Sequence, residues 1–117
     1  MILGIGTDII EISRIKNAIA RWGDNFLNHI FCEEEISYCK KYQNPAQHFA
    51  VRFAAKEAVY KAMDDESLGW KDILILNKSN GQPYCIIKKN DFSNNILISL
   101  SHSKEYAIAY ATITSKE

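Results

Sequence analysis

Residues 45–63 read PAQHFAVRFAAKEAVYKAM, and this stretch decides the fold. Proline stands at the first position, where a helix tolerates it, and Ala, Phe, Lys and Glu fill the interior. Asp64, Asp65 and Gly69 follow and mark the end of the helix and a loop. The stretch therefore predicts one long helix against which the other segments pack.

The segments before this helix predict one strand and several shorter helical pieces. Residues 1–12 are rich in β-branched side chains and favour a strand. Residues 13–22 carry apolar side chains at helical spacing, and Ser13 is the predicted N-cap. Residues 26–42 are weakly helical in two pieces, with residues 33–35, all Glu, suited to the first turn of the second.

The segments after this helix predict two β-hairpins. Residues 72–76 and 84–88 flank a turn that contains Asn80-Gly81-Gln82-Pro83. Residues 96–101 and 106–114 alternate strongly, and the second places small apolar side chains on one face: Ala107, Ala109, Ala111 and Ile113. The pattern predicts an α+β fold, an antiparallel or mixed β-sheet packed against the long central helix, with residues 1–117 forming one domain.

The composition limits the classes of partner. Of 117 residues, 47% are hydrophobic and 24% are charged, and 14 Lys and Arg balance 14 Asp and Glu. This balance argues against a nucleic-acid partner, because such affinity comes from neutralising many phosphates. No apolar stretch approaches the roughly 20 residues that span a bilayer, and the N-terminal segment lacks the basic region of a signal peptide, so we expect no membrane partner.

The three cysteines indicate the compartment. Cys32, Cys39 and Cys85 form an odd set without the paired spacing of a zinc site or a disulfide framework. We therefore expect reduced, structural thiols in a cytoplasmic protein.

One carboxylate of the long helix occupies a position where an apolar residue is due. On a helical wheel, the apolar stripe of Ala46, Phe49, Ala50 and Phe53 continues onto Glu57. A buried unpartnered carboxylate is costly, so Glu57 should bind a cation, form an ion pair, be protonated or border a cavity. The simpler alternative is an ordinary helix pair with Lys61, four residues on.

A second carboxylate lies on the first strand. Alternation places Gly4, Gly6 and Asp8 on one face, and the two glycines leave this face bare, as where a ligand or another backbone approaches. The alternative is a bulge, or tight packing of the helix across the strand. The Gly4-Ile5-Gly6 segment lacks the third glycine of a dinucleotide fingerprint.

Together these residues predict a phosphate site with a divalent cation. Asp8 and Glu57 in one cavity would suit Mg²⁺, which takes one or two protein carboxylates and completes its shell with water and substrate phosphate. Lys61 could neutralise a phosphate. His102, near a turn, is either a phosphate donor, an acid–base group or a structural residue.

The same residues carry a resemblance to a known family over nearly the whole chain. The chain resembles the holo-acyl-carrier-protein synthases, the small single-domain group of 4′-phosphopantetheinyl transferases. The resemblance rests on four motifs in order: GIGTDIIEI at 4–12 followed by Arg14-Ile15, RFAAKEA at 52–58 followed by Lys61-Ala62, Gly81-Gln82-Pro83, and Leu100-Ser101-His102-Ser103 before Ala107 and Ala109. It implies the 4′-phosphopantetheinyl transferase-like fold.

The resemblance also implies an activity. It implies transfer of the phosphopantetheine arm of coenzyme A to a serine of an apo acyl carrier protein, with Mg²⁺ and release of 3′,5′-ADP. It further implies an enzyme of fatty acid and lipid metabolism that forms a homotrimer with active sites between subunits. The alternatives are a non-catalytic carrier-protein or nucleotide-binding module of the same fold and a metal-dependent phosphohydrolase.

The resemblance implies roles for individual residues. Asp8 and Glu57 match the metal ligands, and Lys61 matches a lysine that contacts phosphate or transfers a proton. His102 and Arg52 match positions that contact coenzyme A. Arg14 matches a basic position that docks an acidic helix of the carrier protein, and Arg21 assists. The general base is left open between Glu57, Lys61 and a metal-bound water, with Glu35 as an outside candidate.

One segment departs from the family pattern. Residues 64–69 read DDESLG, where the family has a glycine-rich Gly-Thr-Gly type turn close to coenzyme A. Carboxylates near the phosphates repel them unless they point away. We therefore expect this loop to weaken coenzyme A binding or to alter the choice of carrier protein.

Overall fold

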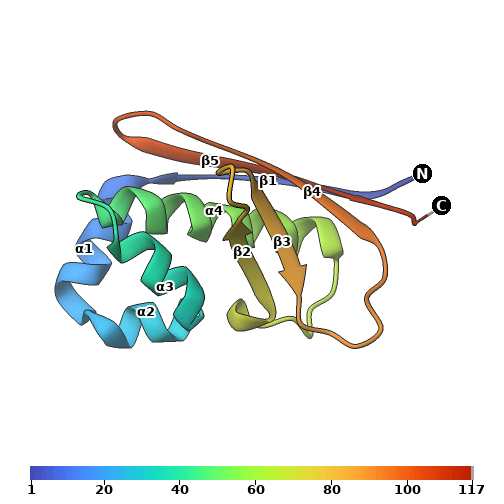
Figure 1. Ribbon diagram of the computed structural model, residues 1–117, viewed down its shortest axis with the longest axis horizontal. Helices are drawn as coiled ribbons and strands as arrows, with labels where there is room; N and C mark the ends of the chain where they lie inside the picture. Colours follow the sequence, from blue (N-terminus) through green and yellow to red (C-terminus); the bar gives the residue numbers. More distant parts are fainter. Residues whose placement is uncertain (117) are drawn as a thin grey trace.

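The computed structural model describes residues 1–116 of the chain (Figure 1). Over these residues the elements are, in order, β1 (Ile2–Glu11), α1 (Ile12–Trp22), α2 (Asp24–Ile30), α3 (Glu33–Lys40), α4 (Pro45–Met63), the 3₁₀ turn η1 (Trp70–Asp72), β2 (Ile73–Asn77), β3 (Pro83–Ile87), β4 (Asn95–His102) and β5 (Tyr106–Thr114). The long helix has the predicted bounds, and the segment before it forms two helices as expected. No helix within residues 1–116 is long and apolar enough to cross a bilayer.

The strands form two sheets, which confirms the α+β class but divides the expected single sheet. One sheet has the order β1-β5-β4, and the other is the β2-β3 hairpin. Every pair within residues 1–116 is antiparallel. Figure 1 shows α4 lying along the inner face of the larger sheet, with α1, α2 and α3 gathered at one end.

The two strand glycines allow α4 to lie directly on β1. A Cβ at Gly4 would stand 2.0 Å from the carbonyl oxygen of Ala62, and one at Gly6 would stand 1.9 Å from that of Ala58. Any larger side chain would therefore push the helix from the sheet. At these two positions it is another backbone, that of α4, and not a ligand that approaches the bare face, so close packing of the helix across the strand is confirmed.

The first helix begins earlier than predicted. Its N-cap is Glu11 rather than Ser13, and no side chain caps it. β1 leads directly into α1 because Ile12 and Ile15 are both buried in the core, so the chain turns while keeping its apolar side chains inside.

Candidate functional site

The structure brings Asp8, Glu57 and Lys61 together where α4 crosses β1. The Lys61 Nζ lies 3.3 Å from Asp8 Oδ1 and donates to the backbone oxygen of Thr7 at 3.0 Å. The Asp8 side chain is only 17% exposed, whereas that of Lys61 is 52% exposed. The Lys61 ammonium therefore binds the strand, and the simple Glu57–Lys61 helix pair is wrong.

Glu57 has no hydrogen bond or ion pair among residues 1–116. Burial raises the pKa of its carboxyl, and the negative charge of Asp8 raises it further, while Lys61 partly offsets both. Two carboxylates from different elements thus repel each other across a shared space. A divalent cation would relieve this repulsion, so the donor set fits the Mg²⁺ that the resemblance implies.

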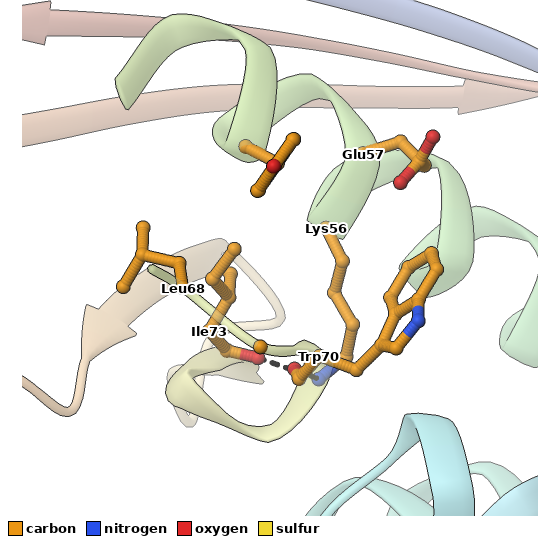
Figure 2. A pocket seen from close by; sticks show the side chains of 7 residues that line it. Lys56, Glu57, Leu68, Trp70 and Ile73 are labelled. Carbon is orange, nitrogen blue, oxygen red and sulfur yellow. Dashed lines mark hydrogen bonds between the residues drawn. The ribbon is translucent and has the colours of Figure 1, made fainter. Parts of the chain in front are cut away.

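A cavity of about 230 Å³ lies beside Glu57 (Figure 2). Glu57 borders it, which is one of the four alternatives that its place on the helical wheel left open. Trp70 stacks on Phe53 with ring centroids 4.9 Å apart. The lining is mostly apolar and comes from α4, the segment before β2 and the first residue of β2: Lys56, Glu57, Tyr60, Leu68, Gly69, Trp70 and Ile73.

Glu35 is not a candidate for the general base. Its side chain is fully buried and lies 2.9 Å from Lys56 Nζ, which is also fully buried. It accepts hydrogen bonds from the backbone N–H groups of Cys32 and Ile75. A carboxylate enclosed in this way cannot reach a substrate hydroxyl, so the outside candidate is wrong.

Within one chain, His102 and Arg52 do not lie beside the two carboxylates of Asp8 and Glu57. His102 is exposed at the end of β4, and one of its ring nitrogens lies 2.7 Å from Gln47 Nε2. Gln47 is ten residues before Glu57 on α4, which is about 15 Å along the helix axis. The roles of both residues toward coenzyme A stay predictions.

Arg52 is held by the protein itself. Its side chain is 3% exposed, and its guanidinium lies 4.3 Å from the ring centroid of Tyr38. It donates to the backbone oxygen of His48 and to Asn77 Oδ1. Only its buried Nε lacks a partner among residues 1–116. Arg52 therefore joins the start of α4 to the end of β2.

The exposed face of α1 is basic and has an aromatic end. Arg14, Ala18, Arg21 and Trp22 lie at helical spacing on one side, and no acidic residue occurs within α1. Trp22 is 55% exposed, and the Arg21 guanidinium lies 5.0 Å from its ring centroid. Its spacing from Ile15 and Ile19 predicts that Trp22 belongs to the buried apolar stripe of this helix, but Trp22 is exposed.

The acidic loop after α4 is partly neutralised. Asp64 adopts the left-handed conformation that ends the helix, with φ 52°. Asp65 forms an ion pair with Lys89 and accepts from the backbone N–H and hydroxyl of Ser67, which together lower the pKa of Asp65 to about 2. The charge of Asp65 is therefore engaged by Lys89, whereas Glu66 is exposed.

Comparisons with known proteins agree over the full chain. A family model of the 4′-phosphopantetheinyl transferase superfamily matches residues 4–111. The holo-[acyl-carrier-protein] synthase of Protochlamydia amoebophila is 45% identical over 98% of this chain and 100% of its own length. That of Thermodesulfovibrio yellowstonii is also 45% identical, over 97% of this chain and 100% of its own.

Solved structures show the same similarity. The structure of a holo-(acyl-carrier-protein) synthase from Bacillus anthracis in complex with CoA (3′,5′-ADP) is 35% identical, with a TM-score of 0.87 and 99% of both chains covered. The structure of the Helicobacter pylori enzyme in complex with coenzyme A is 30% identical, with a TM-score of 0.85 and coverage of 94% of this chain and 99% of that one.

Proposed function

The chain belongs to the 4′-phosphopantetheinyl transferase superfamily, and we infer from this membership that it is a holo-[acyl-carrier-protein] synthase. It transfers the 4′-phosphopantetheine arm of coenzyme A to a serine hydroxyl of an apo acyl carrier protein and releases 3′,5′-ADP. The observation in this chain that carries the assignment is the unpartnered Glu57 carboxylate facing Asp8 beside a cavity.

We propose that Asp8 and Glu57 hold Mg²⁺, supported by their mutual repulsion. When bound, this ion neutralises charge on the pyrophosphate of coenzyme A. Lys61 is half-exposed on a flexible stem, so it can turn from Asp8 to a phosphate oxygen. The serine oxygen forms a bond to the β-phosphorus as the bond to the leaving 3′,5′-ADP breaks, and the broken bond's electron pair leaves on the phosphate oxygen of 3′,5′-ADP. The serine proton passes to the general base, for which Glu57, Lys61 and a metal-bound water are the candidates, and the protein mainly positions the two reactants.

We propose that the basic face of α1 docks an acidic helix of the carrier protein, supported by its lack of acidic residues. Reversing both charges in Arg14→Glu/Arg21→Glu should raise the KM for the carrier protein about tenfold or more. The KM for coenzyme A should stay unchanged. Lys116→Glu, a charge reversal at an exposed site outside α1, is the matched control in the same steady-state assay.

We propose a homotrimer with active sites between subunits. The support is the outer face of the larger sheet, which exposes large apolar side chains by 43% to 63%: Leu3, Ile5, Ile9, Leu97, Tyr106, Ile108 and Tyr110. Ile9 pairs with Ile108 across the two strands, so the apolar surface is continuous. A monomer rarely exposes such a patch. A neighbouring subunit would also supply the exposed His102 to Asp8 and Glu57, whereas Arg52 is buried and held within its own chain.

A charge in this patch should break the assembly. Light scattering after size exclusion should give the wild type a trimeric mass and Ile9→Lys a monomeric one, because a buried unpaired ammonium is costly. Ile86→Lys is the matched control, since Ile86 is 42% exposed on β3 in the other sheet. A trimeric mass for Ile9→Lys would contradict the placement of the interface.

We further propose that the enzyme acts in the cytoplasm in fatty acid biosynthesis. The cysteines support a reducing compartment, because Cys32, Cys39 and Cys85 are all free thiols. Burial raises the pKa of both Cys39 and Cys85 to about 12, so these two thiols are unreactive.

The activity is tested by intact-mass spectrometry of apo acyl carrier protein incubated with this protein, coenzyme A and Mg²⁺. We expect a phosphopantetheine adduct with the wild type and none with Asp8→Ala. Absence of the adduct on several carrier proteins would favour a binding module. Hydrolysis of coenzyme A without a carrier protein would favour a phosphohydrolase.

A further inference from the structure

A fully buried ion pair lies behind the cavity that Glu57 borders. Lys56 Nζ and Glu35 Oε1 are 2.9 Å apart, and both side chains are 0% exposed. Burying such a pair seldom adds net stability, because the desolvation of two charges offsets their attraction. Its presence in a small core therefore points to a positional role.

The pair joins four elements at one point. Lys56, on α4, donates to the backbone oxygens of Trp70 at 2.9 Å and Ile73 at 2.5 Å. Glu35, on α3, accepts from the backbone N–H groups of Cys32 at 2.8 Å and Ile75 at 2.9 Å. Lys56 thus uses its three protons on three protein acceptors, and none remains for a ligand.

The two carbonyl bonds of Lys56 fix the wall of the cavity. Trp70 and Ile73 are both lining residues, and they lie on a segment that Lys56 ties to α4 one residue before Glu57. Figure 2 shows the Lys56 side chain running from α4 down to this segment, with Glu57 projecting from the same helix. Loss of the bonds would free the wall while α4 stays packed on Gly4 and Gly6.

The lining indicates what this wall contacts. Apart from Glu57 and the fully engaged Lys56, it is formed by Tyr60, Leu68, Gly69, Trp70 and Ile73. It offers no available cation to a nucleotide phosphate. An uncharged chain of methylene and amide groups attached to the phosphate near Glu57 fits such a lining.

We propose that Lys56 and Glu35 are positioning residues that hold the Trp70–Ile73 wall against the pantetheine arm of coenzyme A. This proposal rests on the proposed function, because it takes coenzyme A as the ligand. It assigns the pair no contact with substrate. The pair sets the distance from the wall to Glu57, and hence the affinity for the arm.

The test compares two ligands that differ by the arm. The double variant Glu35→Gln/Lys56→Met removes both charges together, so that no unpaired charge stays buried. Titration calorimetry with Mg²⁺ should show coenzyme A binding weakened about tenfold, while 3′,5′-ADP, which lacks the arm, changes by less than about twofold. Ile113→Ala is the control for lost stability, because Ile113 is buried outside the cavity lining. Ile113→Ala should lower Tm, but it should not weaken the binding of coenzyme A more than the binding of 3′,5′-ADP.

The outcomes distinguish failure of the positioning role from failure of the proposed function. Equal weakening of both ligands, or unchanged affinity for both in a folded variant with a lower Tm, would show a merely structural pair and overturn the inference. Should the double variant not fold, Lys56→Arg, which keeps a cation opposite Glu35 but changes the geometry of the bonds to Trp70 and Ile73, is measured in the same way and judged by the same ratio. A wild type that binds coenzyme A but transfers no arm would refute the proposed function, while the ligand comparison would still decide the inference.

Discussion

Glu57→Gln is expected to lower the rate of arm transfer about 10³-fold, because a neutral amide cannot hold the metal that offsets charge in the transition state. The change keeps the size of the side chain, and Glu57 makes no hydrogen bond among the described residues that the amide would break. The loss should appear in kcat, measured by intact mass of the carrier protein at saturating coenzyme A and Mg²⁺.

The matched control is Glu33→Gln, the same change at an exposed glutamate at the start of α3. It should retain turnover within about twofold, since exposed substitutions away from a site have small effects. Full metal-dependent turnover by Glu57→Gln would remove Glu57 from the site.

The same substitution should stabilise the fold at neutral pH. The pKa of Glu57 is raised in the folded protein, first by burial and then by Asp8. A carboxyl with a raised folded pKa binds its proton more tightly in the native state, so its ionisation above that pKa costs stability. Glu57→Gln removes this cost, and its Tm should exceed that of the wild type at pH 7. The rise in Tm that Mg²⁺ gives the wild type should be absent.

The fold could be predicted well where local pattern and packing agree. The long helix α4 has its expected bounds because proline starts it and Asp64 ends it in a left-handed conformation. The alternation of β5 correctly predicted its buried face. The division into two sheets could not be predicted, because hairpin signals indicate pairs of strands and do not say which pairs join. The close packing of α4 on Gly4 and Gly6 could not be decided from the sequence either, because it depends on which element crosses the strand.

The candidate site, too, could be predicted only where one strand or one helix decides where a side chain lies. Strand alternation predicted the face on which Asp8 lies, and the helical wheel predicted the face on which Glu57 lies. Each prediction needs only the geometry of one strand or one helix, and the two faces meet in the structure. The burial of Arg52 and Lys56 was beyond such an argument. α4 is covered on several sides, so Arg52 and Lys56, which a wheel places beside the apolar stripe and not on it, become enclosed by α3 and β2. Their partners, Glu35 and Asn77, come from distant parts of the sequence.

Mixing two inactive variants should restore activity, and this is the second large effect we expect. Glu57→Gln removes the metal site, and His102→Glu places a negative charge at the predicted phosphate contact. His102 is exposed, so the second change should not impair folding. Each variant alone should give almost no transfer at coenzyme A concentrations below the wild-type KM. The two chains are co-expressed with different tags, and mixed trimers are isolated.

Recovery follows from the separation of the two residues within one chain. If each active site takes Glu57 from one subunit and His102 from the next, every mixed trimer has both native residues at one of its three sites, and activity should return to about a third of the wild-type value. If each site lies within one chain, every site in a mixed trimer retains one defect, and no activity returns. The position of His102, bonded to Gln47 about 15 Å along α4 from Glu57, favours the first result.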